Sequence, residues 1–165
     1  MKSPGFTLVE LMITLALCAL VVGLTIVNVS FLDRGIVRSE VDKLYSACMY
    51  TQQCALAMGQ QYELVFDEQN NSYTFAGKTE RLRPPVVFGV VAGAKGPPSS
   101  PSKKITKPIT FKHKKILFGP TGSISSGTVY LTDAKRNCLY ALSNGIAQVS
   151  HLRKYSYTGT WKLLP

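Results

Sequence analysis

Acidic side chains are few in this chain of 165 residues, and they are scarcest in its second half. There are 9 Asp and Glu residues against 19 Lys and Arg, and only Glu80 and Asp133 lie within residues 77–165. That half carries a net charge of +13 (fifteen basic minus two acidic residues), whereas residues 1–76 carry −3 (four minus seven). With so few carboxylates, this half is poorly equipped to form a catalytic carboxylate pair or to coordinate a hard cation such as Ca²⁺.

The local motifs of catalytic and metal sites are also missing. The only histidines, His113 and His151, belong to no recognisable catalytic motif, and the four cysteines form neither a C-x-x-C pair nor a cluster with histidine at zinc spacing. There is no G-x-S-x-G, no P-loop and no dinucleotide fingerprint. The sequence therefore predicts a protein that is not an enzyme and that needs no metal or cofactor.

A long apolar stretch near the amino terminus predicts a transmembrane helix. Residues 6–32 contain one charged side chain, Glu10, and 27 residues are enough for a helix to cross a bilayer. The stretch is too long for the apolar core of a secretory signal peptide. A carboxylate in hydrocarbon costs roughly 2.5–3.5 kcal/mol, so we expect Glu10 to have a partner and a function.

The five preceding residues, MKSPG, offer that partner. If the chain were cut after Gly5, the new amine of Phe6 would lie one helical turn from Glu10, or near the Glu10 of a neighbouring subunit. The two charges would then neutralise each other. The alternative is an ordinary signal anchor in which Glu10 lies near the headgroups.

The segment Gly5-Phe6-Thr7-Leu8-Val9-Glu10, followed by an apolar helix, resembles the class III leader of type IV pilins and type II secretion pseudopilins. The resemblance implies that a prepilin peptidase cuts between Gly5 and Phe6 and methylates the amine of Phe6. It also implies a single-pass protein of the bacterial inner membrane with a periplasmic C-terminal domain, which joins a filament of other pilin-like subunits after processing. Many relatives have a helix-bending proline after the span, where this chain has Val27-Asn28-Val29.

After residue 32 the pattern becomes that of an amphipathic helix and then that of short strands. Apolar residues recur at three- and four-residue steps, and Gly59 is expected to end the helix. The apolar positions are Val37, Val41, Leu44, Cys48, Ala55 and Met58. The predicted strands are Tyr62–Phe66, Tyr73–Ala76, Val86–Val91, Ile109–Lys112, Lys115–Phe118, Thr128–Thr132, Cys138–Leu142 and Ile146–Ser150. A turn is predicted at Ser143-Asn144-Gly145 and an exposed, flexible loop near residues 93–104.

Three segments of the second half, at residues 117–122, 127–133 and 140–149, resemble in order the β domain of the GspH/FimT family of minor pseudopilins and pilins. The fold of that family is a long amino-terminal helix on two small antiparallel β-sheets. We therefore predict an α+β fold with a pilin-like stem and head. Its parts are a leader (1–5), a transmembrane helix segment (6–32), an amphipathic helix segment (33–59) and an antiparallel β head domain (60–165).

The function that this resemblance implies is that of a minor pseudopilin, a structural subunit of a type II secretion pseudopilus or of a related type IV pilus tip. The alternative is a minor pilin that binds DNA for uptake. Arg153, Lys154 and Lys162 alternate with Tyr157 and Trp161 near the carboxyl end, and such residues can contact phosphates and stack on bases. Because basic charge alone is a weak indicator of nucleic-acid binding, we favour the first reading. A third is a membrane-anchored domain that never polymerises.

The four cysteines allow one disulfide. Cys18 lies in the predicted span, where it serves as a small apolar side chain. Cys48 and Cys54 cannot bridge each other within an intact helix, because six residues separate them by ~9 Å along the axis. Cys138 could bridge to Cys48 or to Cys54 in an oxidising periplasm.

Overall fold

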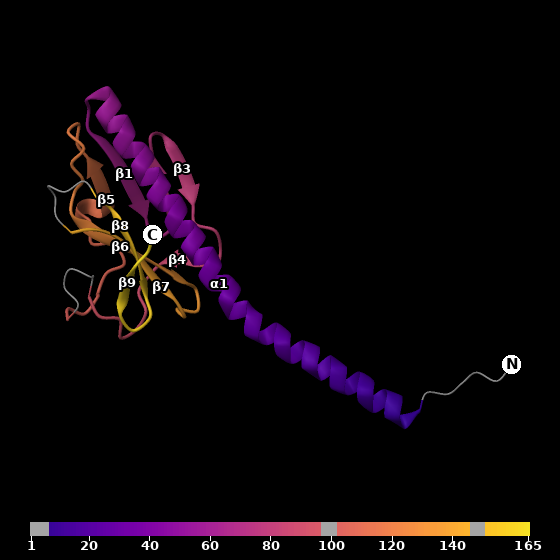
Figure 1. Ribbon diagram of the computed structural model, residues 1–165. Coiled ribbons are helices and arrows are strands. Elements are labelled where there is room, and N and C mark those ends of the chain that lie inside the picture. The colour runs from indigo at the N-terminus through magenta and orange to yellow at the C-terminus, as the bar shows by residue number, and fades with distance from the viewer. Residues whose placement is uncertain (1–6, 97–101, 146–150) are drawn as a thin grey trace. The chain divides into compact units, whose positions relative to one another are not determined.

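The computed structural model of the protein describes residues 7–96, 102–145 and 151–165, with the side chains of residues 24–32 left out. The chain forms two compact units, Met1–Asp33 and Arg34–Pro165 (Figure 1). One helix, α1 (Leu8–Met58), contributes residues to both. Among the side chains that the structure describes, no helix qualifies as a membrane span by length and hydropathy.

In the second unit, one stripe of α1 packs on the β-sheets. Val37, Val41, Leu44, Cys48 and Ala55 are fully buried, as the apolar spacing predicts. The predicted stripe is wrong at its last position, since Met58 is 66% exposed. The helix ends there, as predicted, because Gly59 follows with a φ of +62°, which glycine adopts without strain.

The strands form two antiparallel sheets. The first has the order β3-β2-β1-β5, from Lys78–Arg81 (β3), Ser72–Phe75 (β2), Tyr62–Asp67 (β1) and Lys115–Phe118 (β5). The second has the order β4-β6-β7-β8-β9, from Val86–Phe88 (β4), Gly127–Asp133 (β6), Leu139–Asn144 (β7), Arg153–Tyr157 (β8) and Trp161–Leu163 (β9). A helix packed on antiparallel sheets confirms the predicted α+β class.

Two predicted strands are shorter or absent. The run Val86–Val91 is a strand only as far as Phe88. The segment predicted as the strand Ile109–Lys112 contributes only an isolated bridge between Ile109 and Val129, and it then turns into a short 3-10 helix, η1 (Lys112–Lys114). The Phe111 ring occupies the space that a Cβ on Gly127 would need, so β6 begins at a residue without a side chain.

The predicted turn at residues 143–145 is wrong. Ser143 and Asn144 are the last residues of β7 and pair with Thr128 and Gly127 of β6. The Asn144 side-chain amide donates to the carbonyl of Ile124 at 2.8 Å, so it fixes the segment before β6 instead of forming a turn. The predicted strand 146–150 lies outside the described residues, and β3, β8 and β9 were not predicted.

Both faces of the five-stranded sheet are covered. One face packs on α1 and on the four-stranded sheet, and the other lies under the segment that follows β4. Val90, Val91, Ala94 and Ile105 of that segment pack near the aromatic ring of Tyr130. The predicted exposed loop is therefore partly buried, with Ala94 only 3% exposed, while residues 97–101 lie outside the described part of the chain.

Candidate functional site

Glu10 is bonded to Thr7 at the start of α1. The backbone N–H and the hydroxyl of Thr7 each donate to Oε2 of Glu10 at 3.1 Å, and the Glu10 N–H donates to the Thr7 hydroxyl at 3.3 Å. This is a capping box, in which a Thr at the N-cap and a Glu three residues later satisfy each other's backbone N–H groups. The sequence contains the T-x-x-E signature of a capping box, which is overlooked when Glu10 is interpreted only as a charge.

The other two predicted processing residues, Gly5 and Phe6, lie outside the described residues. The cleavage between them and the pairing of the Phe6 amine with Glu10 therefore stay predictions. If the cut is made there, Thr7 becomes the second residue of the mature chain, so the capping box begins directly beside the new amine.

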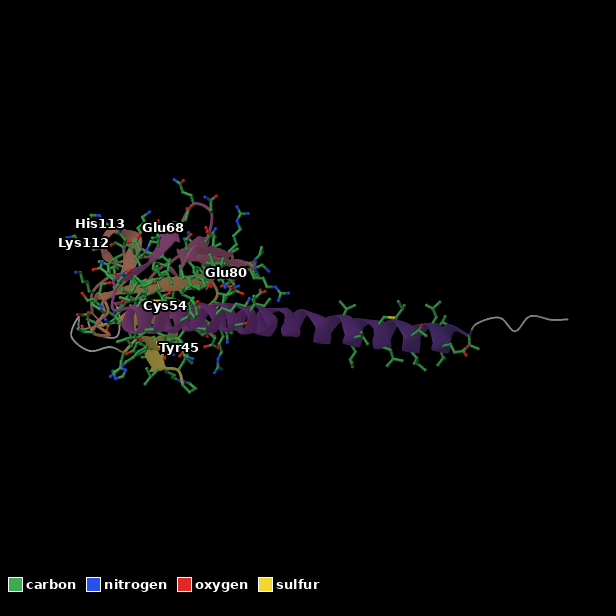
Figure 2. All side chains as sticks on the ribbon, turned by 90° about the horizontal axis from the view of Figure 1, so that it is seen from above. Tyr45, Cys54, Glu68, Glu80, Lys112 and His113 are labelled. Carbon is green, nitrogen blue, oxygen red and sulfur yellow. The ribbon has the colours of Figure 1, made fainter. Side chains whose placement is uncertain are left out.

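The helix that follows the capping box is apolar on every side. Ten large apolar side chains between Leu8 and Val22 are 54–76% exposed, including the consecutive residues Leu11, Met12 and Ile13 (Figure 2). Three consecutive positions cannot share one face of a helix, so the apolar surface surrounds it. A helix that is apolar all round is stable only in lipid or among other apolar helices.

The basic and aromatic residues predicted to contact DNA lie on the β8–β9 hairpin, but the hairpin divides them between its two faces. Tyr157 pairs with Trp161 across the strands, and their ring centroids are 5.0 Å apart. Arg153 shares their face, because side chains alternate along a strand. Lys154 and Lys162 point to the opposite face.

Two of these residues are already engaged. The Lys154 ammonium forms an ion pair with Asp42 at 2.7 Å and lies 5.2 Å from the centre of the Tyr45 ring. The indole N–H of Trp161 donates to the carbonyl of Lys95 at 2.9 Å. The structure therefore brings Tyr157 and Trp161 together but does not form a joint basic and aromatic surface with the lysines.

All four cysteines are free thiols in the structure, so it does not contain the bridge proposed for Cys138. Burial raises the pKa of the Cys138 thiol to about 12, against a smaller, opposite effect of the Arg34 guanidinium. Neither Cys48 nor Cys54 on α1 is bonded to Cys138.

Asp133, at the end of β6, holds the turn to β7. Its Oδ1 accepts hydrogen bonds from the backbone N–H groups of Asn137 at 2.7 Å and of Cys138 at 3.0 Å. Burial raises the pKa of the Asp133 carboxyl, but these hydrogen bonds outweigh that effect and leave the pKa below its ordinary value. The carboxylate therefore stabilises the folded second unit.

Replacing Asp133 with alanine should lower the free energy of unfolding by about 1–3 kcal/mol, because the buried N–H of Cys138 and the half-buried N–H of Asn137 lose their acceptor. The pKa of Asp133 is lower in the folded than in the unfolded protein. The ionised carboxylate therefore contributes fully to the free energy of unfolding above about pH 3.9, the ordinary pKa of Asp, and this contribution is lost as the pH falls through the folded-state pKa. Asp133→Asn, which keeps an acceptor oxygen, should lack that acid-dependent step. Denaturant unfolding at several pH values, followed by the fluorescence of Trp161, measures both effects. Parallel pH profiles for wild type and Asp133→Asn would contradict this assignment.

Residues 1–26 match the prokaryotic N-terminal methylation motif, which includes Gly5, Phe6 and Glu10 and continues into α1. No curated protein and no solved structure matches the chain. The motif is typical of membrane-anchored proteins that are processed by a prepilin peptidase and assemble with other pilin subunits. Together with the helix packed on antiparallel sheets, the motif is consistent with the precursor of a type IV pilin-like protein.

Proposed function

We propose that the mature protein is a minor pseudopilin of the GspH/FimT type, a structural subunit of a type II secretion pseudopilus or of a related type IV pilus tip. The observation that carries the proposal is the methylation motif, which leads into a helix with exposed apolar side chains on every side. Such a helix needs lipid before assembly and other apolar helices after it. The two antiparallel sheets on the second part of α1 also support this family.

In this proposal the precursor is a single-pass protein of the bacterial inner membrane, and residues 34–165 lie in the periplasm. The run of 27 residues with Glu10 as its one charge, residues 6–32, supports the membrane location. Prepilin peptidase removes residues 1–5 and methylates the amine of Phe6. The subunit then leaves the bilayer and buries its apolar helix among those of its neighbours. This role is structural and not enzymatic.

Processing tests the proposal directly. Mass spectrometry of protein extracted from membranes of the native host should show a mature chain that begins at methylated Phe6. The same protein made in a host without a prepilin peptidase should begin at Met1 and carry no methyl group. An intact Met1 on filament-associated protein from the native host would contradict the proposal.

A further inference from the structure

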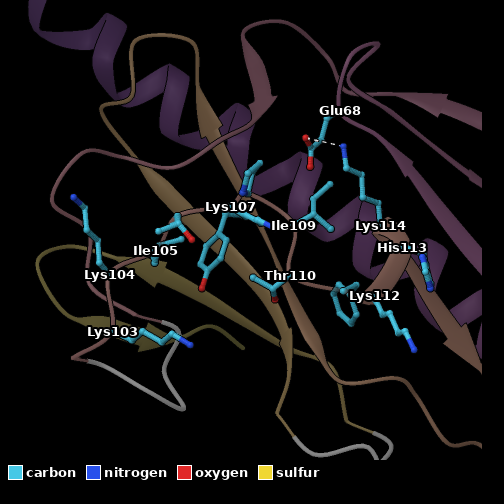
Figure 3. A pocket seen from close by; sticks show the side chains of 14 residues that line it. Glu68, Lys103, Lys104, Ile105, Lys107, Ile109, Thr110, Lys112, His113 and Lys114 are labelled. Atoms are coloured by element: carbon cyan, nitrogen blue, oxygen red, sulfur yellow. Dashed lines mark hydrogen bonds and ion pairs between the residues drawn. The ribbon is translucent and has the colours of Figure 1, made fainter.

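A groove of about 820 Å³ lies in the second unit, between the segment 103–114 and Tyr130 of β6 (Figure 3). The basic residues that line it are Lys103, Lys104, Lys107, Lys112, His113 and Lys114. Figure 3 shows them distributed along the groove instead of gathered at one end. The one carboxylate in the lining, Glu68, accepts a hydrogen bond from Lys114 at 3.1 Å.

The groove therefore has a surplus of positive charge. Among the described residues, Lys103, Lys104, Lys107 and Lys112 form no ion pair, and all four are exposed. Figure 2 shows the side chain of Lys112 at the outer surface of the unit. Like charges held along one groove repel each other and attract an anion.

A second copy of this chain would supply little of the missing negative charge. Residues 34–165 carry 18 basic and 7 acidic side chains, a surplus of +11. Six of those acids are already engaged. Glu40, Asp42, Glu63 and Glu68 pair with lysines, and Asp67 and Asp133 accept backbone N–H groups of turns. The charge that fills the groove has to come from a different molecule.

Tyr130 adds a specific hydrogen-bond donor to the lining. Its side chain is 0% exposed, and its hydroxyl is one of two buried side-chain polar atoms without a hydrogen-bond partner in the described part of the chain. The neighbouring Thr128 hydroxyl is bonded to Ser143 at 2.8 Å. Burial raises the pKa of Tyr130 to about 12, against a smaller, opposite effect of the Thr128 hydroxyl, so at neutral pH the Tyr130 hydroxyl keeps its proton. The Thr128 hydroxyl lies near that of Tyr130, but the two do not meet the geometry of a hydrogen bond. Buried hydroxyls rarely stay unpaired, and an oxygen-rich anion would supply the acceptor.

The chemistry of the lining favours phosphate groups on a compact ligand. Lysine binds phosphate as a point charge, and several lysines along one groove suit a ligand that carries several negative charges close together. The two aromatic residues of the lining, Phe111 and Tyr130, are buried, so no ring is free to stack on a base. Concave sites of this volume hold small molecules, whereas a nucleic-acid duplex presents a convex surface.

We propose that this groove binds a compact ligand that carries several phosphate groups. Lys103, Lys107 and Lys112 neutralise the phosphates. The lining side chains that cover the Tyr130 hydroxyl shift on binding, and the hydroxyl then donates to a phosphoryl oxygen. A free polyphosphate and the phosphorylated headgroup of a lipid share this chemistry. This site is separate from the helix that the proposed filament function uses, so either proposal can fail without the other.

The probe for the first test is inositol hexakisphosphate, titrated by calorimetry into the full chain in detergent at about 0.15 M salt. We expect saturable binding in the micromolar range. The triple variant Lys103→Gln, Lys107→Gln, Lys112→Gln should bind at least about tenfold more weakly. The matched control, Lys78→Gln, Arg81→Gln, Lys135→Gln, removes the same charge from exposed positions outside the groove and should change the affinity by less than about twofold. Equal losses in the two triple variants would overturn the proposal.

A second variant tests the donor. Tyr130→Phe removes a hydroxyl without a hydrogen-bond partner among the described residues, so the melting temperature should stay the same or rise. Its affinity for inositol hexakisphosphate should nevertheless fall about tenfold, the usual effect of losing a hydrogen bond to a charged group. Unchanged affinity in this variant would remove Tyr130 from the site and overturn the proposal as stated.

Three further titrations separate the sources of the phosphate. Tighter binding of a short-chain phosphatidylinositol bisphosphate than of free inositol trisphosphate would assign the groove to lipid headgroups, and equal binding would assign it to a soluble ligand. Both results support the proposal. Polyglutamate that binds as tightly as inositol hexakisphosphate would overturn the preference for phosphate. Duplex DNA that binds more tightly, and is lost in the lysine variant, would overturn the preference for a compact ligand.

Discussion

The variant Gly5→Leu is expected to remain at full length, with no detectable mature chain. A leucine side chain would occupy the place of the hydrogen that the peptidase is expected to require before the scissile bond. Gly5→Ala adds a smaller obstruction and should be cut slowly. Pulse labelling in the native host, with mass spectrometry of the amino terminus, measures the fraction of chains that begin at methylated Phe6.

The matched control for this experiment is Gly23→Leu. It adds the same side chain within the apolar segment that follows the leader, and a Cβ at Gly23 would meet no atom within 4 Å. Because residues 1–5 are unchanged, this variant should be processed like the wild type. Normal cutting of Gly5→Leu, or equal inhibition in both variants, would rule out the class III leader.

The second large effect concerns Glu10, and the capping box allows its two roles to be separated. Glu10→Gln removes the charge but keeps an oxygen that can accept from Thr7. Thr7→Ala removes the cap but keeps the charge, at a cost of about 1 kcal/mol at the helix start. Glu10→Ala removes both. If Glu10 neutralises the Phe6 amine, incorporation into filaments should fall at least about tenfold in both Glu10 variants, because an unpaired amine is left in apolar surroundings.

Thr7→Ala is the control for a purely structural effect, and it should assemble nearly normally. Crosslinking to other pilin-like subunits, corrected for the amount of processed protein in the membrane, measures incorporation. Glu10→Gln that assembles like the wild type, together with a defective Thr7→Ala, would show that Glu10 acts through the capping box and not through charge.

The elements that the sequence predicts well are those whose signals are local. Lys115–Phe118 is a strand with the predicted bounds, and α1 ends at the predicted glycine. The prediction of a turn at Asn144 is wrong, because the side-chain amide of Asn144 donates a hydrogen bond to the carbonyl of Ile124, 20 residues earlier in the chain. In the sequence, β8 resembles part of a basic tail, because the ion-pair partner of Lys154 is distant in the chain. That partner, Asp42 on α1, lies 112 residues earlier.

The candidate sites also differ in whether the sequence alone reveals them. Glu10 stands out in the sequence because a charge inside an apolar run is unusual. The groove beside Tyr130 could not be predicted from the sequence, because it requires the segment 103–114 to lie beside β6. The hydroxyl of Tyr130 becomes notable only when its burial is known. A tyrosine in an apolar strand otherwise carries no signal of ligand binding.

The strand order has a consequence for the order of folding. In the five-stranded sheet, β6 pairs with β7, β7 with β8 and β8 with β9, so these contacts between successive strands close short loops. In the four-stranded sheet, β1 must also meet β5, where Leu64 pairs with Ile116 across 52 positions. Closing a longer loop costs more chain entropy, and sheets with distant partners form more slowly. We therefore expect the β6–β9 meander to form before the β1–β5 pairing, and that pairing to limit the folding rate.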